Sequence, residues 1–244
     1  MMKFFSNQGP FGRLMARFWI LFAANLLFMA SCLPIVTAGA GLSALYYTTL
    51  RTLRGDGELH LVSTFWKGFK DNWKQGTIAW LVLLTLAFLL YLEIFWCGQI
   101  GGWAVLFQYA LLGIGLAALS VGCYLFPVIA AFRGTLPQLV RNSFYFVMKR
   151  PPVAIIVVVL YIVPMYWTWL NTAALPLYAF LWCTVGFSGI AMLVSKLILP
   201  LFVPYLPAVD SFGNILEDGE APSGRTADRQ TDLQTLEDMK KLGM

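Results

Sequence analysis

Residues 76–96, GTIAWLVLLTLAFLLYLEIFW, decide the fold class of this 244-residue chain. Glu93 is the one charged side chain in the stretch, which is as long as the ~20 apolar residues that a helix needs to cross a bilayer. The stretch also lacks the polar face of a helix on the surface of a soluble domain. It therefore predicts a membrane-spanning helix.

The composition of the whole chain agrees with a membrane protein. Hydrophobic residues make up 59% and charged residues 12%, against the roughly 25% charged residues of soluble domains. The mean hydropathy is +0.72. The formal net charge is +5, but the basic residues before residue 207 fall between or beside apolar runs, where such residues set membrane topology. We therefore expect a lipid bilayer as the environment and no nucleic-acid partner.

The apolar runs predict an all-α, polytopic membrane helix bundle. Residues 18–50 form an apolar run that is too long for one membrane-spanning helix, and Pro34 interrupts this run. They form either a hairpin of two short spans or one span with a re-entrant segment. The hairpin returns the chain to the side of the N-terminal basic residues before the next basic segment, so it is favoured. The six predicted transmembrane helices cover residues 18–33, 35–50, 76–96, 103–126, 153–169 and 177–196.

An even number of crossings places both chain ends on one side of the membrane. Because this side collects the basic segments, it is the cytoplasmic side of a bacterial plasma membrane. The membrane domain is then residues 1–207. Residues 208–244 hold eight of the twelve acidic residues and predict an acidic, largely disordered cytoplasmic tail.

Two cytoplasmic connections predict amphipathic interfacial helices. In the first, which follows an expected N-cap at Asp56, Phe65 and Phe69 recur at helical spacing opposite lysines. The second covers residues 135–149 and includes Phe144. Such helices either anchor the chain at lipid headgroups or dock a partner protein, and the sequence favours the anchor.

No residue pattern indicates catalysis or a cofactor. His60 is the single histidine, a Gly-rich phosphate loop is missing, and no span holds a pair of carboxylates. The four cysteines lack the spacing of a metal site. We therefore expect no enzyme, no cofactor and no metal.

A few polar residues lie within or beside the spans. Asn25, Glu93, Gln108 and Asn171 together predict either a polar pocket that opens outward or, as the favoured interpretation, separate interhelical hydrogen bonds. Glu93 also has a simpler place near the outer end of its span. Small residues four apart, such as Gly39 with Ser43 and Gly113 with Ala117, predict seams of close helix packing.

Three segments resemble the YesL family of bacterial integral membrane proteins. The most specific is PIVTAG at residues 34–39, followed by ALYY at residues 44–47. FWKGFKDNWKQ at residues 65–75, with Asn72, is similar to that family's aromatic and basic loop. Asn142 and Phe144 in NSF resemble its second loop.

The resemblance implies a role in carbohydrate uptake. Genes of this family often lie beside oligosaccharide importers of the ATP-binding-cassette (ABC) type in Gram-positive bacteria. The leading hypothesis is therefore a non-catalytic accessory membrane protein that contacts the permease subunits of such an importer. The alternative is a small autonomous transporter or channel, and the sequence leaves the ligand and the homo-oligomeric state open.

Overall fold

The structure is a computed structural model that describes residues 10–54, 60–100 and 102–206, and every regular element in these ranges is a helix. This confirms the all-helical class. Within these ranges, four helical stretches are long and apolar enough to cross a membrane, which fits a membrane protein. They are Leu61–Ile100, Ala104–Ala131, Pro151–Leu170 and Thr172–Tyr205. They include the last four predicted spans, whereas the predicted count of six is not confirmed.

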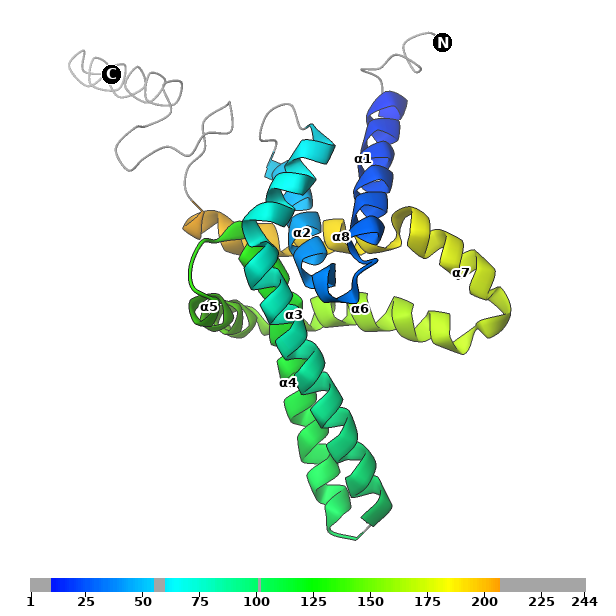
Figure 1. The fold of residues 1–244 in the computed structure, drawn as a ribbon, viewed down its shortest axis with the longest axis vertical. Coiled ribbons are helices and arrows are strands. Elements are labelled where there is room, and N and C mark those ends of the chain that lie inside the picture. Colours follow the sequence, from blue (N-terminus) through cyan, green and yellow to red (C-terminus); the bar gives the residue numbers. More distant parts are fainter. Residues whose placement is uncertain (1–9, 55–59, 101, 207–244) are drawn as a thin grey trace, which may run out of the picture.

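The first two predicted spans correspond to helices α1 (Pro10–Ser31) and α2 (Ala38–Arg54). The chain breaks at Pro34 as predicted, and a 3-10 turn, η1 (Ile35–Thr37), joins the two helices. Neither helix is among the candidate spans, because the apolar part of α1 is short and α2 carries many polar side chains. Most of α2 is buried, so it is the central helix of the fold (Figure 1).

Helices α3 (Leu61–Ile100) and α4 (Ala104–Ala131) form a long antiparallel hairpin (Figure 1). The first predicted interfacial helix is not a separate element, because it continues into the third predicted span as α3. Gly76, where the span was expected to begin, packs directly on α2. A Cβ at Gly76 would lie 2.9 Å from the Ala40 Cα, so only glycine allows this close approach of α3 to α2. Asp56, the expected N-cap, lies outside the described residues.

Helix α5 (Leu136–Lys149) agrees closely with the second predicted cytoplasmic helix. A capping box between Thr135 and Gln138 starts it. Its location at a membrane surface stays a prediction. Helix α6 (Pro151–Leu170) follows. The last helical stretch runs through the 3-10 turn η2 (Thr172–Ala174), α7 (Leu175–Leu181), the π-helix η3 (Trp182–Gly186), α8 (Phe187–Phe202) and the 3-10 turn η4 (Val203–Tyr205).

The core gathers where α2, α3, α4, α5 and α8 meet. Its largest fully buried side chains include Tyr46, Tyr124, Phe65 and Phe202. From this core the α3–α4 hairpin and the α6–α7 pair extend in different directions (Figure 1). The outer part of the hairpin therefore contacts little of the chain besides itself. The predicted acidic tail lies outside the described residues.

Candidate functional site

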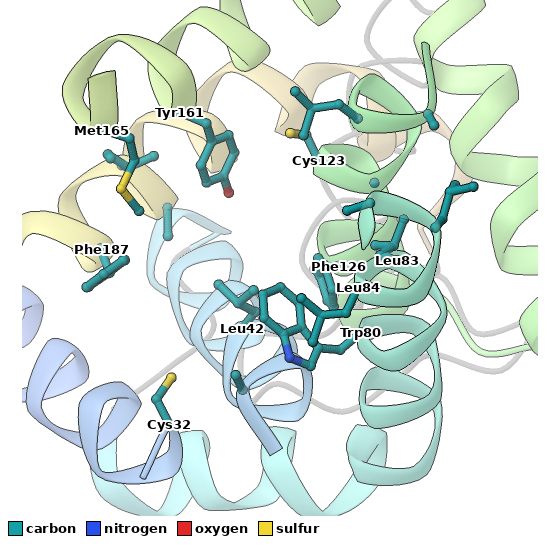
Figure 2. Close-up of a pocket in the computed structure, with 18 of the residues that line it drawn as sticks. Cys32, Leu42, Trp80, Leu83, Leu84, Cys123, Phe126, Tyr161, Met165 and Phe187 are labelled. Carbon is teal, nitrogen blue, oxygen red and sulfur yellow. The ribbon is translucent and has the colours of Figure 1, made fainter. Parts of the chain in front are cut away.

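A cavity of about 660 Å³ lies between the α3–α4 hairpin and helices α6 and α8 (Figure 2). Its volume is within the range of roughly 300–1,000 Å³ that is typical of small-molecule sites. Side chains from six helices and from η3 form its wall. Those that define its outline are Phe28, Leu42, Trp80, Cys123, Tyr161 and Phe187.

The wall of this cavity offers almost no free polar group. The indole nitrogen of Trp80 donates to the Ile35 carbonyl at 3.0 Å. The indole nitrogen of Trp182 donates to Thr168 Oγ1 at 3.0 Å. The hydroxyl of Tyr161 is hydrogen-bonded to that of Tyr46. Because these groups already have partners in the protein, the cavity favours an apolar occupant.

Asn25 determines the shape of one side of this cavity. Its side chain is fully buried on α1 and reaches the π-helix η3. The amide nitrogen donates to the carbonyls of Trp182 at 2.9 Å and Cys183 at 2.7 Å. The amide oxygen accepts a hydrogen bond from the backbone nitrogen of Ser188 at 3.0 Å.

These three bonds join α1 to the π-helix and to the start of α8. A side chain inserted into the hydrogen-bond ladder of a helix distorts it, and π-helical turns are frequent at functional sites. Here the Asn25 amide satisfies backbone groups that the widened turn leaves open. The anchored turn places Trp182 and Phe187 on the cavity wall, where Phe187 also packs on Phe28 with ring centroids 5.2 Å apart. Asn25 thus takes the interhelical role that the sequence favoured.

The other three polar residues predicted around a pocket lie elsewhere. Glu93 is exposed on the outer part of α3. Gln108 lies on α4 across from Gly98, whose added Cβ would be 3.8 Å from the Gln108 amide nitrogen. Asn171 donates to the carbonyl of Trp167 at 3.1 Å, at the end of α6. The structure therefore does not bring these residues together with Asn25, and none of the four lines the cavity.

The predicted contact residues on the first part of α3 differ in exposure. Phe65 is 1% exposed and belongs to the core. Phe69 packs against that core and stacks on Trp66, with ring centroids 5.3 Å apart. The Asn72 amide donates to the Gly68 carbonyl at 3.0 Å, one turn earlier. Phe65 is thus placed to stabilise the fold, whereas Phe69 and Asn72 leave part of their side-chain surface exposed to a partner or to solvent.

On α5, Asn142 is half-buried and Phe144 is exposed. Beside them lies a cluster that the sequence analysis missed, made of Tyr145, Lys149 and Tyr205. Lys149 Nζ donates to the Tyr205 hydroxyl at 2.8 Å, and the two tyrosine hydroxyls lie 3.1 Å apart. The hydrogen bond to Tyr205 raises the pKa of Tyr145 above its ordinary value. This cluster ties the end of α5 to η4.

Potential metal ligands are scattered in the described part of the chain. No three His, Cys, Asp or Glu side chains gather there as a metal site requires. The cysteines at positions 32, 97, 123 and 183 are free thiols in the structure, and two of them line the apolar cavity. The wall of the cavity therefore suits apolar groups.

Comparison with known proteins agrees with the predicted resemblance. Residues 21–94 match the family model "Protein of unknown function, DUF624". The chain is 24% identical over 138 residues to the "Uncharacterized protein YesL" of Bacillus subtilis (strain 168). The chain is therefore similar to YesL. The alignment with YesL covers 57% of this chain and 62% of the relative, so less than two thirds of the relative is spanned. No solved structure matches the chain.

The match to the family model includes the central features of the fold. Residues 21–94 contain Asn25, all of α2 and most of α3. The segments PIVTAG and FWKGFKDNWKQ, which carried the resemblance, lie within this range. The first forms the turn between α1 and α2, and the second is the part of α3 that packs on the core.

Proposed function

We propose that this chain is a non-catalytic membrane subunit whose helix α4 binds a helix of a partner membrane protein, and that the partner is the permease of an ABC-type carbohydrate importer. The observation that carries the proposal is an unused packing seam on α4. A Cβ at Gly113 would meet nothing within 4 Å, and Ala117, one turn later, is exposed. Small residues four apart allow two helices to approach closely in a membrane.

The contrast with the protein's other small-residue seam supports this proposal. Gly39 and Gly76 lie against each other inside the chain, where an added Cβ at Gly39 would be 2.3 Å from the Gly76 carbonyl oxygen. That seam is used to hold α2 on α3. The seam at Gly113 has no equivalent neighbour, so it is free to receive a helix from another molecule.

The surroundings of the seam also favour a partner within the bilayer. In the most apolar stretch of α3, only 6% of the residues are buried inside the protein. The neighbouring helix α4 exposes Leu112 and Leu116 beside the seam. Exposed apolar faces of this kind are compatible with lipid or with a packed helix. In membranes the packing of small residues is what favours the helix.

The resemblance to the YesL family is the basis for proposing an importer as the partner. The alternative function, an autonomous transporter, needs polar groups along a pathway through the membrane. Asn25, Glu93 and Asn171 lie on different elements, and the described cavity has an apolar wall. These placements favour the accessory subunit.

The test is affinity purification of the tagged full-length protein from its native membrane in mild detergent, followed by mass spectrometry. We expect recovery of a permease subunit, and a severalfold loss of it with Gly113→Leu, which fills the seam. The control is Ala179→Leu, which adds a side chain at an exposed position of α7. Recovery of no permease, or equal recovery from both variants, would contradict the proposal. Recovery of a second copy of the chain instead would make the seam a homodimer contact.

A further inference from the structure

The lining of the apolar cavity includes about ten residues' length of each helix in the α3–α4 hairpin. On α3 its lining begins at Trp80 and ends at Leu90, and on α4 it begins at Gly115 and ends at Phe126. Ten residues of helix rise about 15 Å. A cavity with a lining of this length and a volume of about 660 Å³ has room for an extended hydrocarbon chain.

Small residues on α4 make room for this space. Gly115, Ala118 and Gly122 all line the cavity. A Cβ added at Gly115 would meet only Leu90 Cδ1, at 3.6 Å. Because these residues are small, α4 leaves open the space that larger side chains would fill.

The chemistry of the wall excludes water and polar ligands. An ordered water needs two to four polar partners, and the indole and hydroxyl groups of this wall bond to other protein groups. Met29 and Met165 add flexible thioether side chains that adapt to the shape of an apolar ligand. The cavity lies among helices that are apolar enough to cross a membrane, and it is partly open between them. Hydrocarbon chains are the molecules that surround such an opening.

We propose that this cavity binds one acyl chain of a membrane phospholipid, which lies along α3 between Trp80 and Leu90. The chain supplies the dispersion contacts that an empty cavity lacks. It also fills the space between the α3–α4 hairpin and α6, which extend in different directions (Figure 1). The proposal is independent of any partner at the Gly113 seam, because the cavity and the seam lie on different faces of α4.

The probe for this site is a phospholipid that carries a photoreactive diazirine in the middle of one acyl chain. The purified full-length protein is reconstituted in phosphatidylcholine and phosphatidylglycerol vesicles that contain a small fraction of the probe. Light links the probe to its neighbours, and mass spectrometry maps the labelled residues. We expect labels on cavity residues such as Trp80 and Cys123 at several times the yield on the exposed face of α3.

Two variants fill the cavity from different positions, Ala118→Phe and Gly115→Leu. Each is expected to lower cavity labelling severalfold, whereas Leu116→Phe on an exposed face of α4 is expected to leave it unchanged. Thermal unfolding of each variant shows that the fold is retained. Two filling variants are used so that the failure of one to fold leaves the other as the test.

Three outcomes would overturn the proposal. Cavity residues labelled no more than the exposed face of α3 would show that the cavity holds no chain. Unchanged labelling in the folded filling variants would place the chain elsewhere. A free fatty acid with the same diazirine serves as a second probe, and cavity labelling by that probe alone would contradict the assignment to a phospholipid.

Discussion

The first and second halves of α3 have different surroundings within the fold. All five buried residues of this helix lie between Thr64 and Ala79, and none follows. Phe65 is 1% exposed, whereas Phe88 is 59% exposed. The difference comes from neighbours and not from hydrophobicity, because the second half is the more apolar one.

The comparison shows how one continuous helix serves two purposes. The first half packs on α2 through the contact between Gly39 and Gly76 and so belongs to the folding core. The second half contacts α4 and leaves its outer surface for lipid or a partner. Substitutions in the two halves should therefore differ strongly in their effect on stability.

The largest effect is expected at the contact between α2 and α3. In Gly39→Leu the new Cβ would lie 2.3 Å from the Gly76 carbonyl oxygen and 2.4 Å from the Trp80 Cβ, so both helices must separate. We expect a loss of more than about 4 kcal/mol of unfolding free energy, enough to prevent recovery of monodisperse protein. Size-exclusion chromatography in detergent measures it. Gly113→Ala is the control. Normal recovery of Gly39→Leu would show that the contact between α2 and α3 is not needed to hold the core together.

A matched pair of phenylalanines measures the contrast between the halves directly. Phe65→Ala should destabilise the protein by about 3 to 5 kcal/mol, because it opens a cavity in a packed core. Phe88→Ala should change the stability by less than about 1 kcal/mol, since its side chain is exposed. The measurement is equilibrium unfolding by SDS titration in mixed micelles. Equal losses for the two variants would mean that the outer half is covered within the monomer.

The next effect concerns the buried amide that anchors the π-helix. Asn25→Leu removes three hydrogen bonds, and we expect a loss of about 2 to 3 kcal/mol, because such bonds are worth about 1 kcal/mol each in membranes. Amide hydrogen exchange at residues 182–188 should also become faster. Asn171→Leu, which removes one local bond to Trp167, is the control. Unchanged exchange in Asn25→Leu would show that the π-helix does not depend on this side chain.

The smallest effect is expected for Glu93→Gln. The carboxylate is exposed on the outer half of α3, so its neutralisation should change the stability by less than about 0.5 kcal/mol. It should also leave any solute flux in liposomes unchanged. A clear loss of flux would favour the autonomous transporter over the accessory subunit.

The sequence alone predicted those features of the fold that depend on local chemistry. Long apolar runs predicted the four candidate spans, Pro34 predicted the break between α1 and α2, and Thr135 marked the start of α5. The features that depend on distant neighbours were missed. The packing of α2 against Gly76, in the middle of a continuous helix, is one of them.

The cavity and the π-helix were missed for the same reason. Asn25 lies 157 residues from Trp182 in the sequence, so its effect on that turn is invisible in the residues around the turn itself. The cavity needs side chains from six helices at once. Phe65 was expected as a contact residue from its position on an aromatic face, and only the packing of α3 shows that Phe65 itself is turned inward.

Photo-crosslinking from the α4 seam tests the central claim most directly. A benzophenone amino acid replaces Ala117 in the full-length protein, and the cells are irradiated before their membranes are dissolved. The account predicts an adduct with an importer permease, while the same amino acid at the exposed Phe180 of α7 gives none. Adducts with lipid alone at position 117 would contradict the claim that this face of α4 binds a partner protein.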